Sequence, residues 1–354
     1  MPEVRPFRAL RYDEAVAGPL EDLVAPPYDI ISPEERRRFL GQSPYNVVHL
    51  TLPDSEEQAA HDLAAWRRDG VLVEDEPALW WLSQDYVGPD GVARTREGFA
   101  GSVRVEPYET GAVIPHERTH AGPKEGRLRL VRATRTQLEP IFLLYDADPP
   151  ISRPDRAPDI AAEEGGITTR AWRIPGAEID LGVPLLIADG HHRYETAVAF
   201  SQEEPSATHT FGVLVSARAP GLVIFPTHRM VELLGTEPPA ADADPLEALR
   251  ELEGEPRGQS AVVLYRRGGA TIVRGGDELD TQLVETFEPH GVTYTPRAEE
   301  AIARVDSGEA EAAFLLRPPE LDEVWEVTSR GEVMPQKSTY FYPKLLSGLL
   351  FHPL

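Results

Sequence analysis

Short apolar segments with strand and helix periodicities follow one another from the start of the chain. Ser32-Pro33-Glu34-Glu35 has the features of a helix start, because serine caps, proline suits the first helical position and acids favour the first turn. Apolar positions recur at helical spacing from 56 to 70. Strands are predicted at 78–87 and 94–105, joined by Gly88-Pro89-Asp90-Gly91, a typical hairpin turn. The first hundred residues therefore predict an α+β unit.

The middle third has a different pattern. Residues 111–136 are rich in His, Arg and Glu and show little apolar periodicity. Buried strands are predicted next, and the last apolar strand leads through a glycine turn into a helix at 195–201. The predicted strands of this region are 138–145, 172–174, 183–188, 211–216 and 222–225.

The low-complexity stretch 235–244 is the best candidate for a linker or exposed loop. Beyond it, helices are predicted near 246–252, 279–287 and 297–305, and strands at 261–265, 271–274 and 313–316. We therefore expect an α+β protein with mixed sheets. Its expected units are an N-terminal α+β unit (1–105), a central phosphate-binding catalytic unit (106–234) and a C-terminal α/β unit (245–354).

Composition places the chain among ordinary globular proteins. Of its 354 residues, 41% are hydrophobic, which is enough for a substantial core. No apolar run approaches the roughly 18 to 20 residues of a membrane-spanning helix, and the first residues lack the profile of a secretory signal. Cysteine is absent, which excludes disulfides and thiolate chemistry and fits a reducing compartment. We therefore expect a cytoplasmic location.

The formal net charge of -24 limits the kinds of molecule that the protein is expected to bind. A surface this negative repels the backbone of nucleic acids and anionic lipid headgroups, so we expect neither nucleic acid nor membrane as a partner. Small anions are repelled as well. A site for a phosphorylated ligand must therefore concentrate positive side chains and amide dipoles locally, which makes clusters of arginine informative.

The first such cluster follows the predicted strand 183–188. Asp189-Gly190-His191-His192-Arg193 forms a glycine turn that enters a helix. The first amides of a helix have no internal partner and lie at the positive end of its dipole, so they bind phosphate oxygens well. Arg193 offers a planar, permanently charged fork, and the two histidines can donate further hydrogen bonds.

Two alternatives to a phosphate site stay open here. Asp189 could simply cap the helix, with the histidines forming a solvated corner. Imidazoles also bind metal ions, but His191 and His192 are adjacent and point apart, so they suit one chelated ion poorly. We expect no metal held by protein side chains. The phosphate interpretation would fail if Arg193 were paired with a neighbouring acid and the turn left no room for an oxyanion.

A second cluster precedes the turn in the sequence. His116-Glu117-Arg118-Thr119-His120 is followed by Lys124, Glu125, Arg127, Arg129, Arg132 and Arg135. This segment is either an arginine-bearing helix with surface salt bridges, or it places a carboxylate and cations opposite the phosphate turn. Weaker candidates, for which a structural role is favoured, are Thr227-His228-Arg229 and Lys337, Tyr340 and Lys344.

These motifs resemble those of known proteins. Asp189-Gly190-His191-His192-Arg193 resembles the phosphate-binding box of the ParB and sulfiredoxin superfamily, and in this form looks most like that of its free-serine kinases. Nearly the whole chain resembles the bacterial and archaeal domain-of-unknown-function 1015 family. The landmarks of that resemblance are Pro26-Pro27-Tyr28-Asp29, His116-Glu117-Arg118-Thr119, Asp189 to Thr196, Pro226-Thr227-His228-Arg229 and Lys337 to Lys344.

The kinase resemblance implies roles for individual residues. Gly190, His191, His192 and Arg193 would contact the phosphates of ATP or ADP, with His116 and Thr119 in the same nucleotide site. Asp189 would assist the acceptor or a magnesium ion, His192 would also take part in catalysis, and Glu117 would deprotonate the acceptor hydroxyl. The stretch between Glu117 and Asp189 is longer here than in the serine kinases.

The expected function is accordingly a kinase that uses ATP or ADP, with Mg²⁺, to phosphorylate the hydroxyl of a small metabolite, free serine or a related amino acid. A nucleotide-binding regulatory protein without turnover and a phosphate-ester hydrolase are the alternatives. Action on DNA is disfavoured by the charge and by the lack of a basic helix-turn-helix pattern. A homo-oligomer is compatible with the sequence.

Overall fold

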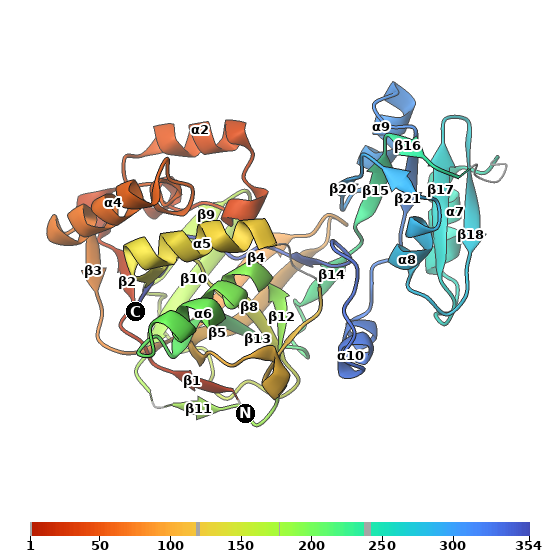
Figure 1. The fold of residues 1–354 in the computed structure, drawn as a ribbon. Coiled ribbons are helices and arrows are strands. Elements are labelled where there is room, and N and C mark those ends of the chain that lie inside the picture. Colours follow the sequence, from red (N-terminus) through yellow and green to blue (C-terminus); the bar gives the residue numbers. More distant parts are fainter. Residues whose placement is uncertain (1, 118–120, 177, 237–241) are drawn as a thin grey trace. The chain divides into compact units, whose positions relative to one another are not determined.

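The computed structural model describes residues 2–117, 121–176, 178–236 and 242–354. Its internal contacts divide the chain into two compact units, shown in Figure 1. Unit 1 comprises Met1–Leu222 and Pro343–Leu354, and unit 2 comprises Val223–Tyr342. The last residues of the chain thus return to the unit in which the chain begins.

Unit 1 is built on a mixed sheet to which ten strands of the described chain contribute. Strand order is β6-β12-β8-β13-β5-β4-β10-β9, and β1 pairs with β5 and β11 beside this path. β6 with β12 and β8 with β13 are parallel pairs, and the other pairs are antiparallel. The strands are β1 (Glu3–Arg5), β4 (Leu79–Val87), β5 (Ala93–Arg104), β6 (Val113–Pro115), β8 (Ile141–Tyr145), β9 (Ile160–Glu164), β10 (Ile167–Ile174), β11 (Ile179–Asp180), β12 (Leu185–Asp189) and β13 (His209–Ser216).

Helices α4 (Glu56–Arg68), α5 (Ala121–Thr134) and α6 (His191–Glu203) pack in sequence, with α5 against both others. In Figure 1, α5 and α6 lie side by side in front of the large sheet. α6 contacts β8 and β13, and its Tyr194 joins the buried cluster that includes Leu143 and Leu185. Since these side chains are fully buried, removing their apolar surface from water holds α6 on the sheet.

Smaller elements complete unit 1. α2 (Pro33–Gln42) starts at a capping box in which Ser32 and Glu35 bond each other's backbone amides, as its sequence predicts. The remaining elements are α1 (Glu14–Ala17), α3 (Val48–Thr51), β2 (Leu10–Tyr12) paired with β3 (Leu72–Glu74), β7 (Thr136–Gln137) paired with β23 (His352–Pro353), and the 3-10 turns Leu20–Asp22, Tyr28–Ile30 and Tyr108–Thr110.

Unit 2 has a five-stranded antiparallel sheet in the order β18-β17-β21-β15-β20. α7 and α9 pack on one face around Leu252, Val263 and Ala301, and α8 packs on the other around Val284 and Phe314. The elements are β14 (Val223–Phe225) paired with β22 (Tyr340–Tyr342), β15 (His228–Val231), β16 (Leu233–Leu234) paired with β19 (Pro289–His290), α7 (Pro245–Glu253), β17 (Ala261–Arg266), β18 (Gly269–Arg274), α8 (Asp280–Glu285), β20 (Thr293–Thr295), α9 (Ala298–Ser307), β21 (Ala312–Leu315) and α10 (Leu321–Ser329).

The α+β class with mixed sheets, expected from the sequence, is confirmed. Strands that precede residue 105 and strands that follow it belong to the same large sheet. The division of the chain into three units at residues 105 and 234 stays a prediction. Among the described residues, none of the helices combines the length and apolar character that crossing a bilayer requires.

Candidate functional site

The predicted phosphate turn lies where β12 passes into α6. The pairing of β12 with β8 is irregular between Ile187 and Asp189, which bends the strand just before the turn. Gly190 then has φ 94° and ψ 30°, in the left-handed region that favours glycine. A Cβ atom at Gly190 would also lie 3.0 Å from Nε of Arg193. Backbone conformation and close packing therefore both call for glycine here.

α6 starts without a side-chain cap. Gly190 occupies the N-cap position, so the N-cap residue has no side chain that could bond the first amides of the helix. The amides of the first turn lack intrahelical carbonyl partners, and the helix dipole adds positive potential at this end. The backbone of the first turn of α6 therefore offers hydrogen-bond donors suited to an anion.

Asp189 binds two cations at once. Its Oδ2 is 2.5 Å from Nη2 of Arg193, and its Oδ1 is 2.6 Å from Nζ of Lys344. Arg193 also donates to the carbonyl of Pro140. Burial alone would raise the pKa of Asp189, but the charges of Lys344 and Arg193 outweigh burial and hold that pKa well below its usual value.

This pairing bears on the predicted role of Arg193. The side chain of Arg193 is buried against Asp189, so in this arrangement the guanidinium is committed to an acid of the protein. One of the two conditions that would count against the phosphate interpretation is therefore met. Direct contact between Arg193 and a phosphate stays a prediction.

A further cation lies near Asp189. Arg96 on β5 is 2% exposed and donates hydrogen bonds to Gln84 and to the carbonyl of Pro343. No carboxylate pairs with it in the described ranges, and its Nη1 has no hydrogen-bond partner there. Burial lowers the pKa of Arg96 to about 9, although Asp189 acts in the opposite direction, so the guanidinium stays charged at neutral pH. Arg96 thus adds a positive charge to the surroundings of Asp189, besides those of Arg193 and Lys344, while Glu139 and Asp29 also act on Arg193.

Glu117 reaches the turn through strand pairing. β6 and β12 are parallel, with Val113 opposite Leu185 and Pro115 opposite Ile187. The residues that follow each strand therefore lie at the same edge of the sheet. Glu117 lies two positions after Pro115, and Asp189 lies two positions after Ile187, the partner of Pro115. The long stretch of sequence between Glu117 and Asp189 therefore does not separate these two residues in space.

His116 connects Glu117 to the turn. Its Nδ1 donates to the carbonyl oxygen of Ile187 over 2.6 Å, and its Nε2 is 3.6 Å from Oε1 of Glu117. The backbone amide of His116 donates to Nε2 of His191 over 3.3 Å. Burial and the neighbouring His116 lower the pKa of His191 to about 3, so His191 is neutral at physiological pH.

The arginines of the second cluster separate into two groups. Arg127 points inward: its guanidinium lies 3.8 Å from the ring centre of Tyr28, and its Nη1 is 3.7 Å from Oε2 of the buried Glu139. Tyr28 belongs to the Pro26-Pro27-Tyr28-Asp29 landmark, which therefore lies beside α5. Arg129, Arg132 and Arg135 instead form exposed ion pairs with Glu56, Glu203 and Glu204. These three fit the surface salt-bridge interpretation.

The structure thus brings most of the sequence-predicted site residues to one end of the large sheet. His116 and Glu117 lie there with Asp189, Gly190, His191 and Arg193, and His192 is in the first turn of α6. Thr119 lies outside the described residues. The catalytic and binding roles of all these residues stay predictions.

Other candidate residues lie in unit 2, and two residues that the sequence did not favour lie near Asp189. His228 and Arg229 are buried in unit 2, where Nδ1 of His228 accepts from the amide of Leu316 and Arg229 pairs with Glu285. Lys344 was a weak candidate from sequence, yet it contacts Asp189 directly. Arg96 was not anticipated. The signal for Lys344 was its place in the Lys337 to Lys344 landmark, whereas nothing in the sequence marked Arg96.

Metal binding by the protein alone does not fit this site. Both carboxylate oxygens of Asp189 are occupied by cationic side chains. Across the described ranges, no group of three or more His, Cys, Asp or Glu side chains is placed to hold a metal ion.

Among solved structures, the chain is similar to a free serine kinase in complex with AMP, at 20% identity and a TM-score of 0.41, covering 68% of this chain and 89% of that one. A conserved hypothetical protein from Pyrococcus furiosus matches at 18% identity and a TM-score of 0.37, covering 68% and 93%. C-terminally truncated SbnI from Staphylococcus aureus matches at 12% identity and a TM-score of 0.39, covering 70% and 85%.

No curated protein matches the chain. A family model does, over residues 4–289, and its description is protein of unknown function (DUF1015). The match spans most of the chain, including the β12–α6 turn, and it confirms the resemblance seen in the motifs. The chain belongs to the DUF1015 family.

Proposed function

We propose that this protein is a kinase that transfers the terminal phosphate of ATP or ADP to the hydroxyl of a small metabolite, free serine or a related amino acid. The observation that supports the proposal is the juxtaposition of the start of α6, the mostly buried cations Arg193 and Lys344 and the carboxylate of Glu117 at one end of the sheet. These are the elements that phosphoryl transfer requires: positioning, charge neutralisation and a group that accepts the acceptor's proton.

The nucleotide phosphates would bind at the first turn of α6. The amides of residues 191–193 are oriented by the helix, so they lose little freedom on binding. Lys344, which contacts Asp189, and Arg96 would supply positive charge near these amides. In a chain of formal charge -24, such a local concentration of cationic side chains favours the binding of an anion at this place.

Glu117 is the better candidate for the base. Asp189 cannot readily accept a proton, because Lys344 and Arg193 hold its pKa well below the usual value. Glu117 would take the proton of the acceptor hydroxyl while that oxygen bonds to the phosphorus. The bond from phosphorus to the bridging oxygen of the nucleotide breaks, and the shortened nucleotide leaves with those electrons. Asp189 would then act by positioning Arg193 and Lys344.

A nucleotide-binding protein without turnover is the second candidate. The ion pair between Arg193 and Asp189 favours it, because the cation best suited to the transferred phosphate is committed to an acid of the protein. Such a module needs the uncapped turn but has no use for Glu117. The role of Glu117 therefore separates the two candidates.

The experiment compares the purified full chain with its Glu117→Gln variant, using ATP or ADP, Mg²⁺ and serine. A kinase should form phosphoserine, followed by ³¹P NMR, and the variant should lose about 10²- to 10⁴-fold in rate with nearly unchanged nucleotide affinity. Glu203→Gln is the control, because Glu203 forms an exposed ion pair at the far end of α6. Absence of product with serine and with other small hydroxyl acceptors would eliminate the kinase; equal nucleotide binding by all three proteins would then favour the binding module.

A further inference from the structure

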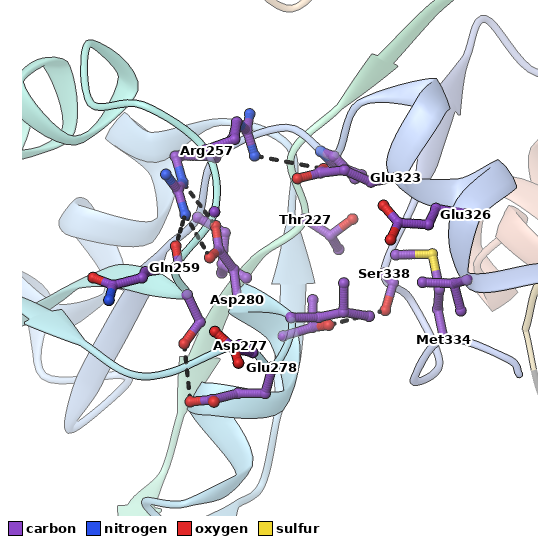
Figure 2. A pocket seen from close by; sticks show the side chains of 18 of the residues that line it. Thr227, Arg257, Gln259, Asp277, Glu278, Asp280, Glu323, Glu326, Met334 and Ser338 are labelled. Carbon is purple, nitrogen blue, oxygen red and sulfur yellow. Dashed lines mark hydrogen bonds and ion pairs between the residues drawn. The ribbon is translucent and has the colours of Figure 1, made fainter. Parts of the chain in front are cut away.

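Carboxylates in the wall of a cavity of about 500 Å³ in unit 2 are paired with arginines. Figure 2 shows Arg257 beside Glu323, with 3.6 Å between the nearest nitrogen and oxygen. Arg317 donates two hydrogen bonds to Asp280, of 2.8 and 2.9 Å. Arginine keeps its proton in proteins, so such pairs fix charge but do not move a proton. The carboxylate of Glu117 in unit 1 differs from them, because it faces an imidazole, which gains and loses a proton near neutral pH.

The main chain fixes one hydrogen on the ring of His116. Nδ1 of His116 lies 2.6 Å from the carbonyl oxygen of Ile187. A carbonyl oxygen only accepts hydrogen bonds, so Nδ1 must carry a hydrogen. Pro115, which stands opposite Ile187 in the β6–β12 ladder, has no amide hydrogen to donate. Whenever the ring of His116 is neutral, Nε2 is therefore the nitrogen that carries no hydrogen.

Glu117 faces this second nitrogen. Its Oε1 is 3.6 Å from Nε2 of His116. A carboxylate and a ring nitrogen without hydrogen are both acceptors, so the two groups attract each other only when a proton lies on one of them. The distance is longer than that of a formed hydrogen bond, and catalytic contacts of this kind commonly shorten when substrate binds. The geometry thus favours a pair that takes up one proton.

Burial gives the two members of the pair different tasks. The side chain of Glu117 is 18% exposed, whereas that of His116 is 1% exposed. Glu117 is therefore the member that can touch a substrate and exchange protons with water. His116 is covered by protein, so it acts on a substrate through Glu117.

The neighbouring His191 is not suited to hold this proton. Nε2 of His191 accepts from the backbone amide of His116 over 3.3 Å, and the two ring centres are 4.8 Å apart. Burial lowers the pKa of His191 to about 3, with further lowering by His116 and His192, and the opposing effects of Glu117 and Asp189 are smaller. His191 is neutral at physiological pH, so a positive charge on His116 meets no second imidazolium at His191.

We propose that His116 is a positioning residue that shares a proton with Glu117. The inference rests on the proposed kinase function in that the proton comes from the acceptor hydroxyl. As the acceptor oxygen bonds to phosphorus, its proton passes to an oxygen of Glu117 and from there to Nε2 of His116. This leaves a carboxylate at Glu117 and an imidazolium at His116, which stabilise each other by opposite charge. The proton then returns through Glu117 to water before the next turnover.

The pair is tested without turnover by NMR of the imidazole nitrogens in the full chain labelled with ¹⁵N-histidine. The signals of His116 are assigned sequentially and confirmed by their loss in His116→Asn. In the parent, Nδ1 should carry the hydrogen at high pH, and Nε2 should take one up as pH falls. In Glu117→Gln the pH midpoint of this uptake should be lower by about one unit or more, because the negative partner is absent. Glu203→Gln, which removes an exposed acid at the far end of α6, should keep the midpoint of the parent.

The role in turnover is tested with His116→Asn and His116→Gln, using ATP or ADP, Mg²⁺ and serine. Asparagine keeps a donor for the carbonyl of Ile187 but has no atom in place of Nε2. Glutamine places an amide nitrogen near Nε2 that donates to Glu117 but takes up no proton. Both variants should lower kcat about tenfold or more with nearly unchanged KM. A thermal unfolding midpoint of His116→Asn equal to that of the parent excludes a folding defect as the cause.

The outcomes separate this inference from the kinase proposal. The inference is overturned if His116 titrates alike in the parent and in Glu117→Gln, or if His116→Asn forms phosphoserine at the rate of the parent. If the parent forms no phosphoserine while the two titrations differ, the kinase proposal fails and the proton-sharing pair stands.

Discussion

At the scale of single residues, the ion pairs of Asp189 join segments that are distant in the sequence. Arg193 is four positions away, whereas Lys344 is 155 positions away and belongs to the returning C-terminal segment. All three side chains are less than one-fifth exposed, so their interactions are weakly screened by solvent. The carboxylate of Asp189 therefore fixes the positions of both cations beside the turn.

Replacing Lys344 with Met should therefore destabilise unit 1. The change leaves Asp189 with one cation in a mostly buried place, and we expect a loss of about 2 kcal/mol in the free energy of unfolding. Urea denaturation followed by tryptophan fluorescence reports mainly on this unit, since four of the five tryptophans lie in it (Trp66, Trp80, Trp81 and Trp172) and only Trp325 lies in unit 2. Arg132→Met, which breaks an exposed pair with Glu203, should cost less than about 1 kcal/mol. Equal losses in the two variants would contradict the burial argument.

His191 should make stability depend on pH. Its folded-state pKa is lowered to about 3, below the value of about 6.5 expected in the unfolded chain. Between these values the unfolded chain binds a proton that the folded chain does not, so stability decreases as pH falls from about 6.5 towards 3. His191→Gln keeps an acceptor for the amide of His116 and should reduce the loss of stability between pH 7 and pH 5. The exposed control His61→Gln should lose as much stability between pH 7 and pH 5 as the parent does. If His191→Gln loses just as much, His191 titrates normally in the folded protein.

The sequence indicated the site residues that belong to local motifs. It did not indicate the residues that are distant in the sequence but contact these motifs in the fold. Glu117, Asp189 and Gly190 stood out because the turn and the arginine-rich segment are unusual in an acidic chain. Arg96 and Lys344 could not be placed, because their positions beside Asp189 depend on the order of strands in the sheet and on the path of the C-terminal segment.

At the scale of elements, the candidate site depends on the parallel pairing of β6 with β12 and on the start of α6. Capping at Ser32 and the turn at 88–91 predicted α2 and the β4–β5 hairpin correctly, because these signals act within a few residues. α5 lacks a clear apolar periodicity, since the charged residue Arg127 points inward, where it contacts Tyr28 and lies near the buried Glu139. The pairing of β6 with β12 has no local signal at all.

Gly190→Ala tests the geometry of the helix start. Alanine must adopt a positive φ there, and its Cβ would press on the guanidinium of Arg193. We expect a loss of more than about 2 kcal/mol in stability, together with weaker phosphate binding. Gly182→Ala is the matched control: Gly182 also has positive φ, but nothing lies within 4 Å of its added Cβ, so only the conformational cost of about 1 kcal/mol applies. Equal costs would mean that Arg193 does not pack over the turn.

At the scale of the whole molecule, unit 2 is inserted into unit 1. The chain leaves unit 1 after Leu222 and re-enters it at Pro343, and the two ends of unit 2 are paired, with Val223 opposite Tyr342 in the β14–β22 ladder. Paired residues of neighbouring strands lie roughly 5 Å apart. A short linker could therefore replace the whole insertion.

A protein in which two or three glycines join Leu222 to Pro343 should fold. It retains the large sheet, the pair of Lys344 with Asp189 and the bond from His352 to Ser102. We expect cooperative thermal unfolding and a near-ultraviolet circular dichroism spectrum typical of packed tryptophans. A chain that ends at Leu222 lacks Lys344 and Phe351 and should not reach this state. Failure of the glycine-linked protein alone to fold would show that unit 1 depends on unit 2.

The proposed kinase requires that the start of α6 bind the phosphate of a nucleotide within reach of Glu117. The most direct measurement is a crystal structure of the protein with a non-hydrolysable ATP analogue and Mg²⁺. We expect terminal phosphate oxygens at hydrogen-bonding distance from the amides of residues 191–193, with Lys344 beside them and Glu117 facing the transferred phosphorus. A nucleotide bound elsewhere, with the turn closed by the pair of Arg193 and Asp189 and no oxyanion next to Gly190, would contradict it.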